Sequence, residues 1–276
     1  MQMIKRGMVT VLLAGIFVAV MGWLLRMPEM ALAQGPGGIA DTFQIGSASD
    51  YFVYLPLVSR HEMTACAPIP DVSYGYLSVV DDPAHDPPDS LAPVDDKELN
   101  IYVRGFSPAE GYKGLVDYNG GSDSRAPQLY TLFSDLRTPV FSNLYYVDEE
   151  RDIYDVNMAG MQVQKNEIIH VPDGGYNIGD GNDVLVLYAT QNQITLKYTR
   201  EDNVVYGYTV HIENICTEPS LLALYEQLDA AGRDNLPALQ GGEPLGRAWD
   251  TEVRVVIRDT GSFMDPRSRK DWWQGR

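Results

Sequence analysis

The chain has 276 residues, a formal net charge of −17 and two cysteines, and 45% of its residues are hydrophobic. This hydrophobic share is too high for a disordered chain, and two cysteines are too few for a disulfide-dense miniature scaffold. An isoelectric point near 4.5 argues against a nucleic-acid partner, because phosphate binding requires a basic surface. The length allows one or two domains with a substantial core.

The first 33 residues have the organisation of a secretory signal peptide. Lys5 and Arg6 precede an apolar run from Met8 to Leu25, and Ala31-Leu32-Ala33 follows. A basic start, an apolar centre and a small-x-small motif predict cleavage after Ala33. An uncleaved anchor is the alternative, since the apolar run is nearly long enough to span a bilayer. We therefore expect a secreted or cell-envelope protein with no membrane span after signal cleavage.

The two cysteines, Cys66 and Cys216, are predicted to form a disulfide, because an exported protein meets an oxidising environment. Two free buried thiols are the alternative. In the chain-entropy model, closing so long a loop contributes roughly 4–5 kcal/mol to stability.

Removal of the signal peptide takes away three basic groups and one acidic group, so the mature chain is two charges more negative than the precursor.

Composition divides the mature chain into a linker and two β-rich regions. Residues 34–68 combine a small, polar stretch with the apolar segment Tyr51–Val58, and residues 81–96 form an acidic, proline-rich loop. We expect a β-rich N-terminal region over 69–172 and a β domain over 173–276. The N-terminal region is expected to contain a half-buried strand over Leu99–Val103, strands over 111–118 and 139–147, a short helix over 128–136, and a weaker strand pair over 161–171.

The second region has the clearest periodicity. The apolar run Val184–Ala189 is typical of a strand buried on both faces. Further strands are predicted over 194–198, 204–215 and 252–258. In the second of these, the chain alternates between two faces, with Tyr208, Val210 and Ile212 on one and Thr209, His211 and Glu213 on the other. A helix is expected after Thr217, which we interpret as its cap, with Pro219 in its first turn, a core face of Leu221, Leu224, Tyr225 and Leu228, and Gly232 after its end. The predicted fold class is mainly β, with antiparallel sheets of the sandwich or duplicated-hybrid-motif type and one prominent helix near 219–231.

The sequence contains no motif with the residue spacing of a known metal-binding site. No two histidines have the spacing of a zinc-binding helix, so His170, Asp173 and His211 would form a zinc site only if the fold gathers them. Residues 173–183 are rich in Asp, Asn and Gly, but they lack the spacing of a calcium loop and are better interpreted as a tight turn. We assign no cofactor and no metal site, with zinc and calcium as the alternatives.

No catalytic residue is assigned, because the chain has no G-x-S-x-G motif and its acidic residues are too numerous to locate a glycosidase pair. Trp249, Trp272 and Trp273 remain after signal cleavage. Exposed tryptophan rings often stack on sugars, so these three are our candidate binding residues. The alternative is that a tryptophan anchors the C-terminus in the core.

Several short motifs in the C-terminal hundred residues resemble the lysostaphin-type peptidoglycan endopeptidases, which have a duplicated-hybrid-motif β fold. The matching segments are Asn182–Ala189, Gly207–Ile212, Tyr225–Leu228, Gly242–Gly246, Glu252–Val256 and Gly261–Pro266. Gln227 stands where the family has a histidine in its Y-x-H-L segment, and Glu252 and Arg254 stand at the two histidines of its H-L-H motif. Since an arginine opposes a zinc ion, the resemblance implies a metal-free member without peptidase activity.

These observations predict a secreted, non-catalytic module of the envelope or the extracellular space that binds peptidoglycan, another glycan or a protein partner. One alternative is a zinc-dependent peptidoglycan endopeptidase or another secreted hydrolase. The other is a structural surface component whose acidic loops bind calcium.

Overall fold

The computed structural model describes residues 66–85, 92–148 and 154–276. The predicted signal peptide and the segment Tyr51–Val58 lie outside these residues. The fold is mainly β, with 34% strand against 12% helix. Residues 61–276 form one compact unit, so the boundary expected at residue 173 does not separate two units. Among the described residues, no helix is both long and apolar enough to cross a membrane.

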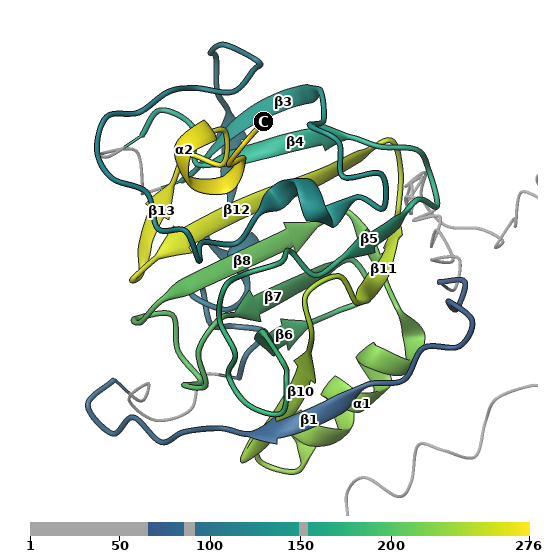
Figure 1. Cartoon of the computed structure of the whole chain (residues 1–276). Coiled ribbons are helices and arrows are strands. Elements are labelled where there is room, and N and C mark those ends of the chain that lie inside the picture. The colour runs from purple at the N-terminus through teal and green to yellow at the C-terminus, as the bar shows by residue number, and fades with distance from the viewer. Residues whose placement is uncertain (1–65, 86–91, 149–153) are drawn as a thin grey trace, which may run out of the picture. The chain divides into compact units, whose positions relative to one another are not determined.

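A ten-stranded antiparallel sheet dominates this unit (Figure 1). Its path runs β1 (Gly75–Ser78), β10 (Asn235–Leu239), β6 (Val184–Ala189), β7 (Gln193–Lys197), β8 (Tyr208–Glu213), β12 (Glu252–Asp259), β4 (Met158–Gln162), β3 (Phe141–Val147) and β2 (Phe106–Pro108), and β13 (Ser262–Met264) pairs with β12. Strands from both predicted regions share this sheet, since β12 pairs with β8 on one side and with β4 on the other. The two regions therefore fold around a common core.

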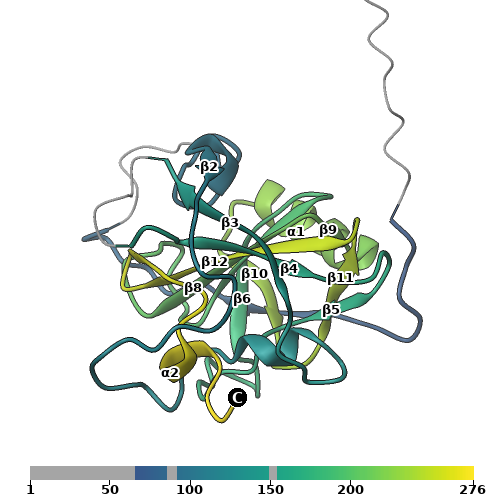
Figure 2. The same ribbon diagram turned by 90° about the horizontal axis from the view of Figure 1, so that it is seen from above.

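A smaller three-stranded sheet has the order β5 (Ile168–His170), β11 (Pro244–Ala248) and β9 (Ile215–Thr217). In Figure 2, β5 and the C-terminal helix α2 (Arg269–Trp272) lie on one side of the central strands of the large sheet, whereas its edge strand β2 lies toward the other side. The main hydrophobic core includes Leu196 of β7, Val210 and Ile212 of β8, and Val255 of β12, all fully buried. The disulfide Cys66–Cys216 is present, with Cα atoms 5.5 Å apart, and ties the start of the described chain to β9.

The predicted helix is α1 (Pro219–Ala230), which contacts β10 and β6. Leu221, Tyr225 and Leu228 are its buried residues, as their spacing indicated. The predicted cap is wrong, because Glu218 and not Thr217 accepts hydrogen bonds from the first backbone N–H groups of the helix. Thr217 is the last residue of β9, and its hydroxyl donates to the carbonyl oxygen of Thr190, 2.6 Å away.

Several predicted strands are confirmed and others are not. The strand over Val184–Ala189 has the predicted bounds, and those over 139–147 and 252–258 match β3 and β12 closely. Residues 111–118 form no strand, since their only ladder contact is a bridge between Val116 and Ser268. The short helix expected over 128–136 is a single 3₁₀ turn, η2 (Leu129–Leu132).

The strand predicted over Leu99–Val103 is also wrong. Its last three residues form the 3₁₀ turn η1 (Ile101–Val103), because the side chain of Asn100 caps the turn by accepting a hydrogen bond from the backbone of Tyr102. Leu99 and Ile101 are buried, as alternation requires, but Val103 is 51% exposed. Asn100, between Leu99 and Ile101, is buried as well, so the turn buries three consecutive residues against the sheet and not an alternating set.

Candidate functional site

One face of the large sheet carries polar and charged side chains, and we call it the polar face. Register places residues of β7, β8 and β12 side by side on it, because paired residues of neighbouring strands point to the same side. Its members include Gln193, Thr195 and Lys197 of β7, Thr209, His211 and Glu213 of β8, and Glu252, Arg254 and Arg258 of β12. The alternation predicted over 208–213 is confirmed, because the other three residues of β8 belong to the main core.

Residues 94–104, which we call the strap, cover part of the polar face. The strap is fixed to β7 by two hydrogen bonds: Thr195 donates to the carbonyl oxygen of Leu99 at 2.7 Å, and Gln193 donates to the side chain of Asn100 at 2.9 Å. Ile101 adds an apolar contact with a small cluster that includes Val256 and Phe263. The strap therefore buries polar groups that would otherwise face solvent.

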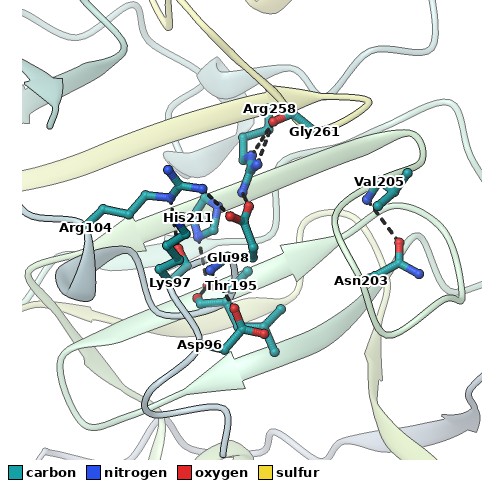
Figure 3. Close-up of polar contacts among 11 residues, drawn as sticks. Asp96, Lys97, Glu98, Arg104, Thr195, Asn203, Val205, His211, Arg258 and Gly261 are labelled. Atoms are coloured by element: carbon teal, nitrogen blue, oxygen red, sulfur yellow. Dashed lines mark hydrogen bonds and ion pairs between the residues drawn. The ribbon is translucent and has the colours of Figure 1, made fainter. Parts of the chain in front are cut away.

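Glu98 is the central charge of the strap (Figure 3). Its carboxylate binds Arg258 of β12 at 2.6 Å and also binds Arg104. Burial alone would raise the pKa of Glu98, but the two guanidinium groups lower it below its ordinary value. Arg258 is held further by hydrogen bonds to the carbonyl oxygen of Gly261 at 2.8 and 2.6 Å. This ion-pair network fixes the strap on the sheet.

His211 lies beneath the strap and is 1% exposed. The Thr195 hydroxyl gives its proton to Leu99, so it accepts a hydrogen bond from His211 Nδ1, 3.0 Å away. Burial, followed by the charges of Arg258 and Arg104, holds the pKa of His211 well below its ordinary value. The imidazole is thus neutral, and its Nε2 has no hydrogen-bond partner among the described residues.

Glu213 lies two residues further along β8 and is fully buried. Burial raises the pKa of its carboxyl group to about 8, and Arg254 opposes this rise only in part, since its Nη1 is 3.9 Å from Glu213 Oε2. The side chain of Tyr102 hydrogen-bonds to this carboxyl group and, like Arg254, lowers its pKa in part. The Oγ1 of Thr209 has no hydrogen-bond partner within the described chain. Thr209 and His211, neighbours on the polar face of β8, therefore hold unpaired polar atoms.

Where the strap ends, two aromatic rings contact Arg254 and a third, that of Tyr102, packs against one of them. We call this group of Tyr102, Phe106, Tyr145, Arg254 and Glu252 the aromatic surface. The guanidinium lies 5.2 Å from the ring centre of Phe106 and 5.1 Å from that of Tyr145, which are cation–π distances. Phe106 also contacts Tyr102 and Tyr145, with ring centres 6.0 and 5.6 Å apart. Tyr102 is 38% exposed, so the surface is open to solvent at this end.

Glu252 fixes the guanidinium of Arg254, which donates to its Oε1 at 3.0 Å. Ser142, Asn143 and Tyr145 of β3 also donate to the same carboxylate. Burial would raise the pKa of Glu252, but these hydrogen bonds lower it below its ordinary value. The carboxylate reaches β3 by crossing over Gly160, where an added Cβ would lie 2.5 Å from the carboxyl carbon. Glycine at this position therefore leaves the space that the Glu252 carboxylate occupies.

The three tryptophans that the sequence analysis proposed as binding residues differ in their burial. Trp272 and Trp273 are 2% and 0% exposed, and their indole N–H groups donate to the carbonyl oxygens of Asp265 and Pro266. Their assignment as sugar-stacking residues is corrected, because both rings belong to the main core and anchor the C-terminus. Trp249 lies in the turn between β11 and β12 and is partly exposed.

The residues considered as zinc ligands do not converge. His170 is on β5, where its Nδ1 lies 3.2 Å from the carbonyl oxygen of Leu132, whereas His211 is under the strap. Asp173 instead lies near Asp183, with both carboxylates beside Gly241. Burial raises the pKa of Asp183, and the charge of Asp173 raises it further. Within residues 66–85, 92–148 and 154–276, no three His, Cys, Asp or Glu side chains are grouped to hold a metal ion.

No protein-family model matches the chain, and no curated protein matches it. Sequence reasoning did not single out Tyr102, Phe106, Tyr145 or Arg254 as binding residues. Alternation along β12 places Glu252 and Arg254 on one face, but it does not indicate that three rings from other elements surround them.

Proposed function

We propose that this protein is an exported, non-catalytic module that binds a glycan through the aromatic surface. The observation that carries the proposal is the position of Tyr102, Phe106 and Tyr145 around a fixed guanidinium–carboxylate pair. Sugar rings combine apolar C–H faces with a rim of hydroxyl groups. Aromatic rings can stack on the C–H faces, and charged planar groups such as those of Arg254 and Glu252 can form hydrogen bonds with the hydroxyl groups.

Preorganisation supports this proposal. Arg254 is held by Glu252, and Glu252 accepts hydrogen bonds from three side chains of β3, so neither charged group has to be ordered when a ligand binds. Rigid binding groups reduce the entropy lost on association. Export is supported by the N-terminal sequence pattern and is compatible with the Cys66–Cys216 disulfide, because disulfides persist mainly outside the cytoplasm.

The resemblance to lysostaphin-type peptidases agrees with binding without hydrolysis. The resemblance places Glu252 and Arg254 at the two histidines of the family's H-L-H motif, one of which is a zinc ligand. In this chain the two residues form an ion pair at 3.0 Å and supply the charged half of the aromatic surface. We therefore propose that the positions of the H-L-H motif, which supplies a zinc ligand in the resembled family, serve ligand contact here.

Glycan binding can be tested by retention of the purified protein on insoluble glycans, including cell-wall sacculi, followed by titration with soluble oligosaccharides. Tyr102→Ala should weaken binding at least tenfold, because one stacked ring is lost. Tyr76→Ala is the matched control, since Tyr76 is 59% exposed on β1, at the opposite edge of the sheet from β2. Absence of retention on every glycan, or equal effects of the two substitutions, would contradict the proposal.

A second candidate function is glycoside hydrolysis, and one observation favours it. Glu213 and Glu252 flank Arg254, and their pKa values are shifted in opposite directions, to about 8 for Glu213 and below the ordinary value for Glu252. A protonated and an ionised carboxyl group are what such an enzyme requires. However, Glu213 is fully buried. Release of reducing ends by the wild-type protein, abolished in Glu213→Gln, would establish hydrolysis in place of simple binding.

A further inference from the structure

An open cleft lies beside the aromatic surface, at the far end of β4 and β12. It encloses about 360 Å³, within the usual range for ligand sites, and is lined by Arg137, Gln162, Val163, Gln164, Glu167 and Thr251. The cleft and the aromatic surface are contiguous. Gln162 pairs in register with Glu252, so both side chains are on the same face of the sheet, and Thr251 precedes Glu252 in the chain.

The charges that line the cleft already neutralise one another. Arg137 binds Glu167 at 2.6 Å and Asp135 at 2.7 Å, and its guanidinium stacks on the ring of Phe133 at 4.2 Å. Glu167 also accepts a hydrogen bond from the backbone N–H of Gln164 at 2.9 Å. With one cation and two carboxylates, this group leaves no excess positive charge for an anionic ligand, and the net charge of −17 on the whole chain disfavours one further.

The groups left for a ligand are amides. The side chains of Gln162 and Gln164 are exposed and make no hydrogen bond to any residue that the structure describes. Each carboxamide offers a donor and an acceptor, which together complement the C=O and N–H of a secondary amide. The hydroxyl of Thr251 adds a group that can donate or accept. The lining of the cleft thus matches a neutral ligand that carries secondary amides.

We propose that this cleft is a subsite for the acetamido groups of an N-acetylated glycan, whose sugar rings contact the aromatic surface. The inference rests on the proposed glycan-binding function and names its ligand class. Tyr145 pairs with Met158, and Gln162 is four residues further along β4. At about 3.3 Å per residue the two positions are about 13 Å apart, so a single oligosaccharide chain can reach both.

The test compares two oligosaccharides that differ in acetamido groups. We would titrate the full-length protein with a hexamer of N-acetylglucosamine and with a glucose hexamer of the same linkage. The acetylated hexamer should bind about tenfold more tightly, as expected for one additional well-made pair of hydrogen bonds. The double variant Gln162→Ala/Gln164→Ala should lose this preference and retain the affinity for the glucose hexamer. Gln227→Ala, at an exposed position on α1, is the matched control and should keep the preference.

The outcomes separate this inference from the function on which it rests. Equal affinity for the two hexamers, or a preference that survives in the double variant, overturns the acetamido subsite and leaves glycan binding intact. Failure of both hexamers, together with failure of every insoluble glycan, overturns the proposed function itself. Binding of an N-acetylated tripeptide in place of either hexamer would assign the cleft to peptides and also overturn the proposal.

Discussion

Glu213→Gln is the substitution that most directly tests the physical account of the polar face. The carboxyl group is fully buried, and burial raises its pKa from the ordinary value of 4.5 to about 8. In the unfolded chain the group loses its proton near pH 4.5, whereas in the folded protein it keeps the proton up to about pH 8. Between these values unfolding releases a proton, so the free energy of unfolding falls as the pH rises. Glutamine has nearly the same shape and does not titrate.

The size of the effect follows from the difference between the two pKa values. Each unit corresponds to about 1.4 kcal/mol, so a carboxyl group with these values costs the folded state about 1 kcal/mol at pH 5 and about 4 kcal/mol at pH 8. The free energy of unfolding of Glu213→Gln, relative to wild type, should therefore increase by about 3 kcal/mol over this range. His211 gives the opposite slope up to its ordinary pKa, because its folded pKa is lowered. This contribution is present in both proteins and cancels in the difference.

The measurement is urea unfolding of both proteins at pH 5, 6.5 and 8 with the disulfide intact. Glu226→Gln, an exposed glutamate on α1, is the control and should show no pH-dependent difference. A difference between Glu213→Gln and wild type that stays constant with pH would refute the reasoning. It would mean that Glu213 is ionised in the folded protein and that Arg254, 3.9 Å away, compensates its charge in full.

Three further substitutions test other parts of the fold. Gly160→Ala should destabilise the protein by about 2 kcal/mol in urea unfolding, because the added Cβ would displace the Glu252 carboxylate from its four hydrogen-bond donors. Unchanged stability would show that the carboxylate can shift without losing these hydrogen bonds. Glu98→Gln should cost about 1–2 kcal/mol, since it removes the charge of a partly exposed carboxylate that binds two guanidinium groups. It should also speed amide hydrogen exchange across the strap, and unaltered exchange would contradict its role. Trp272→Ala should cost about 3–5 kcal/mol, as for a large core residue, whereas Trp249→Ala should cost less than about 1 kcal/mol; similar losses would contradict their different burial.

The local pattern of the chain determined much of the fold. The continuous apolar run at Val184–Ala189 predicted β6, since a strand buried on both faces has no reason to alternate. Alternation over 208–213 correctly assigned His211 and Glu213 to the face opposite the main core. These predictions succeed because side-chain direction in a strand depends only on position along the backbone.

Tertiary structure decided what covers each face. Alternation at Leu99–Val103 predicted a strand with Leu99 and Ile101 buried. In the structure this segment lies on the polar face of the large sheet, where it forms a capped 3₁₀ turn. The turn buries Leu99 and Ile101 as well as a strand would. The same limit explains Trp272 and Trp273, whose large rings suit a core or a ligand equally well when only the sequence is known.

The candidate site depended on tertiary structure most of all. Its rings come from η1, β2 and β3, and its charges from β12, so no segment of the chain contains the arrangement. The pKa of Glu213 likewise depends on burial by other elements, whereas the sequence shows only that a glutamate is present. A sequence therefore determines on which face of a strand a side chain lies, and long-range packing decides whether that face meets solvent, core or a ligand.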